Sequence, residues 1–200
     1  MSTRNDRILK IVQMALLSAL IVILQQIVIP LPGGLTLSLV LIPLVVGAAL
    51  LGPAYGAALG AVFGAVVSAL VVTGRAGELS TMMWIEAPFF TILVCMLKGI
   101  AAGFVSGLVA KAFSKRKTIG IFLAAASAPI VNTGIFLLGM FTCFYDVMQA
   151  FAEKIGMAGT SMIYFAVIVL VGINFLVEFA ANLLFSPAIV RVVDAVRKSK

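Results

Sequence analysis

The stretch PFFTILVCMLKGIAAGFVSGLVA, residues 88–110, decides the fold class. Its one charged residue is Lys98, and about 20 successive apolar residues suffice to cross roughly 30 Å of hydrocarbon as a helix. Other stretches are equally apolar, because 63% of the 200 residues are hydrophobic and only 10% are charged. Soluble domains carry about 25% charged residues. The sequence therefore predicts an all-α integral membrane protein.

Lys98 needs an explanation because a lysine at bilayer depth costs about 3 kcal/mol on insertion scales. Such a residue usually turns inward, pairs with another polar group or points at a ligand. A functional hypothesis for this chain has to account for it.

We expect one compact domain over residues 1–200 with six membrane-spanning helices, whose ends follow from breaker residues. The first ends before Pro30 to Gly34, and Gly52-Pro53 separates the second from the third. Pro129 is expected to interrupt the fifth, and residues 142–160 to form an external loop with a partial helix. The helices should cover about residues 8–29, 37–51, 54–72, 87–113, 119–141 and 161–185, the last continuing past Pro187 into an amphipathic tail.

The net charge of +7 is distributed in short segments that flank the apolar stretches, which indicates membrane orientation and not nucleic-acid binding. With both termini in the cytoplasm, 11 of the 14 lysines and arginines lie inside, and only Arg75 and Lys154 lie outside. The positive-inside rule therefore predicts a multi-pass protein with two cytoplasmic termini.

Glycines recur every four residues in the third and fourth expected helices, at Gly56, Gly60 and Gly64 and again from Gly99 to Gly107. Small residues at this spacing let helix backbones approach closely in lipid. This pattern indicates tight packing and says nothing about a substrate.

Three polar side chains on different helices should lie at similar depth. At about 1.5 Å per residue, Lys98, Asn132 and Asn174 lie roughly 18, 14 and 20 Å below the outer helix ends. Glu178 and Asn182 share a face with Asn174, one and two turns deeper. Two interpretations stay open: Lys98 and Glu178 pair while the asparagines fasten helices, or the cluster contacts a ligand.

Nearer the outer surface lie Gln25, Gln26, Arg75, Trp84 and Glu86. Trp84 is either an interfacial anchor or the wall or lid of a pocket beneath the outer loops. The glycine-rich loops around Gly33-Gly34 and Gly74 to Gly77 have the composition of movable gates, although each also fits an ordinary turn.

Several chemistries are excluded by what the chain lacks. It has no histidine and only two cysteines, Cys95 and Cys143, so we expect no metal site, no cofactor and no histidine-based catalytic constellation. No phosphate-binding loop is present, so an energy source for transport would have to come from a partner or an ion gradient. The alternatives that remain are a solute-binding transport subunit and a membrane scaffold with a filled interior.

Local motifs resemble the substrate-binding S component of energy-coupling factor (ECF) vitamin transporters over nearly the whole chain. Ala15 to Ala19 resembles that family's Ala-x-x-x-Ala pattern, and Leu51 to Gly56 resembles its Leu-Gly-Pro-x-x-Gly turn. The segments 129–134 and 174–187, which contain Asn132, Asn174, Glu178 and Asn182, also resemble segments of S components.

The resemblance implies a non-enzymatic subunit in a bacterial cytoplasmic membrane that captures a small vitamin from outside. A transmembrane coupling (T) subunit and two ATPases would be its partners besides membrane lipid, with Ala15 and Ala19 forming the docking surface. The implied substrate-binding residues are Lys98, Asn132, Asn174, Trp84, Arg75 and Glu178.

Within this family the sequence most resembles the pantothenate-like and unassigned members, so the resemblance makes pantothenate the expected vitamin. The acidic Asp-x-x-Asp pair of riboflavin-type members is missing, and Thr36 to Pro43 stands in its place. Lys98 or Arg75 could bind the carboxylate, and Asn132 and Asn174 the amide and hydroxyls. Riboflavin or folate remain alternatives.

Overall fold

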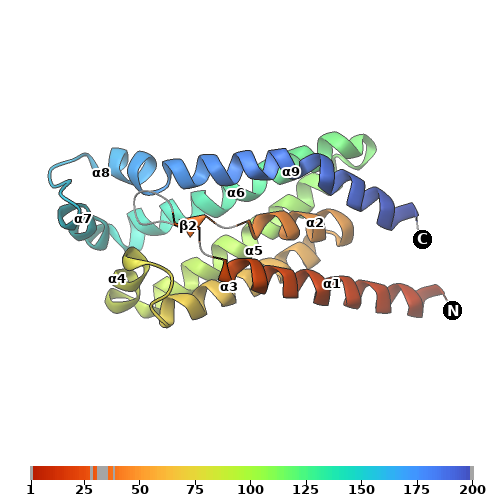
Figure 1. The fold of residues 1–200 in the computed structure, drawn as a ribbon, viewed down its shortest axis with the longest axis horizontal. Helices are drawn as coiled ribbons and strands as arrows, with labels where there is room; N and C mark the ends of the chain where they lie inside the picture. Colours follow the sequence, from red (N-terminus) through yellow and green to blue (C-terminus); the bar gives the residue numbers. More distant parts are fainter. Residues whose placement is uncertain (1, 28, 31–35, 38, 199–200) are drawn as a thin grey trace.

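The computed structural model describes residues 2–27, 29–30, 36–37 and 39–198, with side chains over 6–27 and 39–196. Five helices in this part of the chain are long and apolar enough to cross a membrane, which confirms the expected all-helical membrane architecture but not the expected count of six. They lie side by side as a bundle (Figure 1): α1 (Ser2–Gln26), α3 (Pro53–Val72), α5 (Pro88–Ala112), α6 (Lys117–Cys143) and α9 (Gly172–Lys198).

Helix α2 (Leu41–Leu51) has 11 residues, about 16 Å, and is too short to cross a bilayer alone. The expected helix over 37–51 is therefore shorter than predicted at its start. Residues 36 and 37 instead belong to strand β2 (Thr36–Leu37), which pairs antiparallel with β1 (Ile29–Pro30). The predicted gate around Gly33-Gly34 falls outside the described residues.

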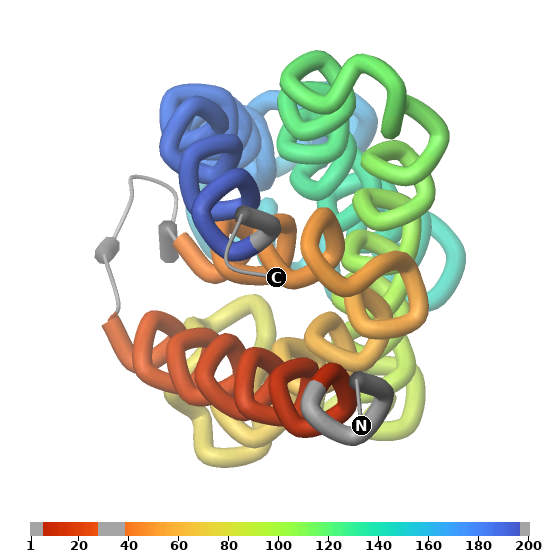
Figure 2. The backbone as a smooth tube through the Cα atoms, turned by 90° about the vertical axis from the view of Figure 1, so that its right-hand side faces the viewer, coloured from red at the N-terminus to blue at the C-terminus, as the bar shows by residue number. Residues whose placement is uncertain are grey.

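Helix α2 lies in the middle of the bundle, between α1 and α3 on one side and α6 and α9 on the other (Figure 2). Leu41, Leu44 and Val45 are almost completely buried, since apolar side chains cover this helix all round. Gly52, with a φ of 100°, then lets the chain turn directly into α3. Helix α2 thus fills the middle of the bundle along its own length.

Helices α3 and α5 meet along the predicted glycine positions. A Cβ atom on Gly60 would collide with the carbonyl of Gly99, and one on Gly103 with the carbonyl of Gly56. Backbones in such contact leave no room for any side chain. We call this contact the glycine seam, formed by Gly56, Gly60, Gly99 and Gly103.

One end of the bundle carries two short helices, α4 (Glu78–Glu86) and α7 (Tyr145–Lys154), which we call the cap (Figure 1). Buried side chains of both helices share one apolar cluster, and an exposed ion pair joins Lys154 to Glu78. The buried Thr91 hydroxyl donates to the carbonyl of Met83 at 2.8 Å, which fixes α4 to the start of α5.

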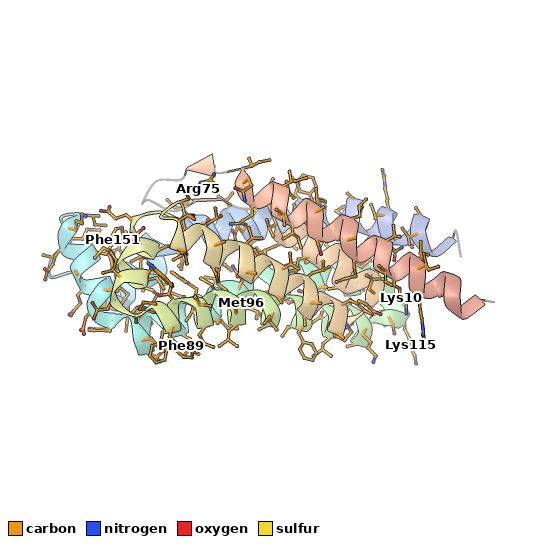
Figure 3. All side chains as sticks on the ribbon, turned by 90° about the horizontal axis from the view of Figure 1, so that it is seen from below. Lys10, Arg75, Phe89, Met96, Lys115 and Phe151 are labelled. Atoms are coloured by element: carbon orange, nitrogen blue, oxygen red, sulfur yellow. The ribbon has the colours of Figure 1, made fainter. Side chains whose placement is uncertain are left out.

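Helix α1 begins, and α9 ends, at the opposite end of the bundle (Figure 1). Lys10 and Lys115 lie at this termini end, far from Phe151 in the cap (Figure 3). The 3-10 helix η1 (Ser114–Arg116) joins α5 to α6 there, and Lys117 pairs with Asp194 of α9. The two chain ends thus lie at the same end of the bundle, as a chain with both termini in one compartment requires.

Three further expectations about the helices are wrong. The first helix was expected to reach Ile29, but α1 ends at Gln26 and Ile29 belongs to β1. Helix α6 continues through Pro129, because membrane helices tolerate proline where neighbouring groups compensate for the lost hydrogen bond. The predicted helix from Ser161 is divided into α8 (Met162–Tyr164), the π-helix η2 (Phe165–Leu170) and α9. The amide of Val171 donates to the carbonyl of Ala166, a five-residue step that widens the turn before α9.

Candidate functional site

A cavity lies beside the cap helix α4, with about 990 Å³ of empty space including its open mouth. None of its lining residues belongs to α2. Six helices (α1, α3, α4, α5, α6 and α9) and the segments next to them contribute the lining. It comprises Gln25, Ile27, Phe63, Val67, Leu70, Arg75, Ala76, Leu79, Ser80, Lys98, Asn132, Thr133, Phe136, Val171, Asn174 and Glu178.

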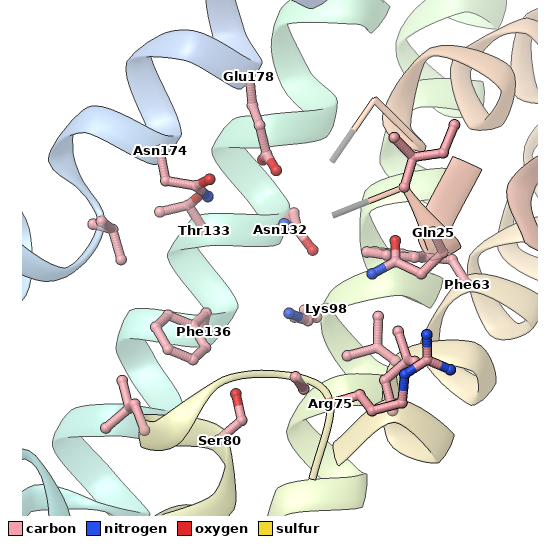
Figure 4. Close-up of a pocket in the computed structure, with 16 residues that line it drawn as sticks. Gln25, Phe63, Arg75, Ser80, Lys98, Asn132, Thr133, Phe136, Asn174 and Glu178 are labelled. Atoms are coloured by element: carbon pink, nitrogen blue, oxygen red, sulfur yellow. The ribbon is translucent and has the colours of Figure 1, made fainter. Parts of the chain in front are cut away.

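Lys98 extends from the middle of α5 into this cavity (Figure 4). Its ammonium Nζ lies 5.9 Å from the ring centroid of Phe63 on α3 and 5.5 Å from that of Phe136 on α6. Both distances fall within the range of cation–π attraction, which is stronger in a desolvated environment than in water. Aromatic faces on two neighbouring helices therefore surround the charge.

Asn132, Asn174 and Glu178 point into the cavity from α6 and α9 (Figure 4). The Oδ1 atoms of Asn132 and Asn174 are buried and accept no hydrogen bond from the described residues. Buried polar atoms normally have partners, so these two carbonyl oxygens are positioned to accept hydrogen bonds from a bound molecule.

Asn182, which shares the helix face of Glu178, does not line the cavity. Its Nδ2 donates to the backbone carbonyl of Glu178 at 2.8 Å, and the backbone carbonyl of Asn182 accepts from the Ser186 hydroxyl at 2.9 Å. This buried side chain contributes to the local packing of α9 beneath the cavity.

The π-helix η2 lies directly before the part of α9 that reaches the cavity. One extra residue in a helical turn rotates everything that follows by about 100° relative to a continuous α-helix. Val171, Asn174 and Glu178 line the cavity in this register. The π-helical turn η2 thus sets which side of α9 faces the cavity.

One helix of the cap, α4, contributes to the wall of the cavity. Leu79 and Ser80 of α4 line it, as does Arg75 from the segment between α3 and α4. Trp84 is not among the lining residues; it is half-buried and packs against the apolar core. Its assignment as a substrate-binding residue has no support from this geometry and stays a prediction.

The structure brings together five of the six predicted site residues: Lys98, Asn132, Asn174, Arg75 and Glu178. Sequence reasoning missed Phe63 and Phe136, since an aromatic residue in an apolar helix gives no sign of whether it faces lipid or a cavity. Phe136 lies one turn beyond Asn132, and that spacing is the signal that could have indicated it.

The charges of the lining do not cancel. Arg75 and Lys98 are cationic and Glu178 is anionic, which gives the cavity a formal charge of +1. A compact site with this charge, two free amide oxygens and apolar walls suits a small anionic molecule that also carries hydrogen-bond donors. Among the described residues, no cluster of side chains is arranged to hold a metal ion.

A comparison with protein families matches residues 9–190 to the ECF transporter substrate-specific component family. The chain belongs to this family. S components are the substrate-binding subunits of importers and work with a coupling subunit and ATPase subunits; they are not enzymes. A comparison with curated proteins gives no match.

Family membership confirms the resemblance found in the sequence and accounts for the membrane-spanning architecture. It also favours an S component's binding site over a scaffold with a filled interior, in agreement with the cavity. The subgroup of S components is not fixed by the match.

Proposed function

We propose that this S component captures pantothenate, or a closely similar hydroxylated monocarboxylate, in the cavity beneath the cap. The observation that carries the proposal is the formal charge of +1 on the lining. A monoanion neutralises this charge, whereas neutral riboflavin leaves it and doubly charged folate reverses it.

The two ends of pantothenate have different chemistry, and so do the regions of the cavity. Its carboxylate would lie near Lys98 and Arg75, where charge-assisted hydrogen bonds are available. Its hydroxyls and amide N–H would donate to the oxygens of Asn132 and Asn174, with Glu178 as a further acceptor.

The orientation in the bacterial cytoplasmic membrane that we propose places the cap outside and both termini in the cytoplasm. The lysines and arginines concentrated at the termini end support it through the positive-inside rule. Two termini on one side require an even number of crossings, so in this topology the chain crosses once more between α1 and α3, through α2. A vitamin would then reach the cavity from outside the cell.

The docking surface that we propose for the coupling subunit includes Ala15 and Ala19. Both are exposed on α1, and only 11% of the residues in the membrane-spanning stretch of this helix are buried within the bundle. Small side chains on a lipid-facing helix permit a second helix to approach closely. Two ATPase subunits would drive release through this contact.

Binding to the purified full chain in detergent tests the proposal. Isothermal titration with pantothenate, its neutral alcohol analogue, riboflavin and folate should give tightest binding for pantothenate. Tighter binding of riboflavin or folate would replace the ligand but keep the transport role. Failure of all four, together with no small molecule co-purifying from several growth media, would contradict a vitamin-binding function.

A further inference from the structure

We infer that Phe63 and Phe136 act as positioning residues that hold the Lys98 ammonium inside the cavity, ready to meet an anionic group. The arrangement, which we call the aromatic cradle, consists of these two rings and the ammonium between them (Figure 4). The inference rests on the proposed function for its role in binding, and its geometry is testable without any ligand.

The cradle addresses a specific difficulty of a lysine at this depth. An ammonium on a flexible four-carbon stem can fold along the helix toward the membrane surface, which removes it from the cavity. Two ring faces at 5.9 and 5.5 Å attract the charge from α3 and α6 and restrict this movement. The ring faces accept no classical hydrogen bond, so the N–H groups remain available to a ligand.

The backbone fixes the cradle on the α3 side. Gly99 follows Lys98 directly, and a Cβ atom there would approach the Phe63 ring to 3.1 Å and collide with the carbonyl of Gly60. Phe63 itself is 4% exposed. The glycine seam therefore sets the distance between the ring and the lysine, and Phe136 completes the cradle from the other side.

Other acceptors for the ammonium line the same cavity, and they make the cradle useful. Asn132, Asn174 and Glu178 lie beyond Lys98 on the α6 and α9 side (Figure 4). The cradle holds the cation apart from this group of oxygens, so that one part of the cavity presents donors and another presents acceptors. A ligand with an anionic end and a donor-rich end then has one favoured orientation.

A ligand-free measurement tests the geometry. The full chain is labelled with lysine carrying ¹³C at the ε carbon, and the Lys98 signal is assigned by its loss in Lys98→Arg. Ring currents should shift the ε protons of Lys98 upfield from those of the surface lysines. Phe136→Leu should move this signal toward the surface lysines, whereas Phe136→Tyr should keep it upfield. An unchanged position in Phe136→Leu would overturn the cradle.

A double-mutant cycle tests its role in binding, with pantothenate and its neutral alcohol analogue as the probes. Phe136→Leu should weaken pantothenate binding about three- to tenfold, and Phe136→Tyr by less than about twofold. In the Lys98→Met background the same Phe136→Leu change should have almost no further effect. An equal loss in both backgrounds would show that Phe136 is only a wall of the cavity and would overturn the positioning role.

The two measurements separate failure of the inference from failure of the proposed function. If pantothenate does not bind the unsubstituted protein, the proposed ligand is wrong, while the NMR shift still decides whether the cradle exists. If pantothenate binds but the shift and the cycle show no dependence on Phe136, the inference is wrong and the proposed function stands.

Discussion

Replacing Lys98 by methionine removes the ammonium but keeps an unbranched apolar side chain that can fill the same space. If the carboxylate of pantothenate binds there, Lys98→Met should weaken its binding about tenfold or more, because charge-assisted hydrogen bonds are among the strongest in proteins. The binding affinity of the neutral alcohol analogue should fall much less. Isothermal titration of both compounds measures the difference, and Lys154→Met in the exposed cap ion pair is the matched control. Equal losses for the acid and the alcohol would contradict the assignment.

Asn132 is the residue at which binding and stability should change in opposite directions. Its Oδ1 is buried and accepts no hydrogen bond from the described residues, an arrangement that costs about 1–3 kcal/mol. Asn132→Leu should therefore leave the unfolding temperature of the ligand-free protein unchanged or higher. The stabilisation by added pantothenate should fall. Thermal unfolding with and without pantothenate measures both effects; a lower unfolding temperature without ligand would show that the side chain is a structural fastener.

At the scale of elements, the glycine seam should be the least tolerant contact in the bundle. Gly60→Ala places a methyl group against the Gly99 carbonyl, and overpacking of this kind typically costs 1–3 kcal/mol. We expect the unfolding temperature to fall by about 5 °C. Gly134→Ala on α6 is the control, because a Cβ atom there meets nothing within 4 Å and alanine favours helix. Similar unfolding temperatures for the two variants would contradict the seam.

The elements differ in how much of them the sequence could predict, for physical reasons. The five long helices follow from apolar length, and the rise per residue was enough to bring Lys98, Asn132 and Asn174 to one level, in agreement with their shared cavity. The start of α2 was missed because residues 37–40 are as apolar as the helix that follows. Helix α4 was missed because its mixed composition resembles a loop, and η2 because π-helical turns depend on tertiary packing.

For the whole molecule, the proposed docking surface predicts a separation of capture from uptake. Ala15→Leu combined with Ala19→Leu adds bulk to an exposed face of α1 and should reduce uptake through the assembled transporter by about tenfold or more, since close helix contact is lost. Binding of pantothenate to the isolated subunit should stay within about twofold, because neither residue lines the cavity. Uptake of labelled pantothenate by cells and titration of the purified chain measure the two steps.

Ala180→Leu is the control for this pair, because Ala180 is equally exposed but lies on α9. It should preserve uptake. Equal loss of uptake in both variants would indicate a general effect of bulk at the lipid-facing surface, and the α1 docking proposal would then be wrong.

The position of Phe63 has a consequence for biogenesis. Ribosomes deliver the chain from its N-terminus, so Lys98 enters the membrane before Phe136, Asn132, Asn174 and Glu178 have been synthesised. Helix α3 is already present at that moment, with Phe63 and the glycines against which α5 packs. The packed pair α3 and α5 can therefore keep the Lys98 ammonium next to the Phe63 ring and away from lipid during insertion. The later helices then pack against a lysine side chain whose position is already fixed.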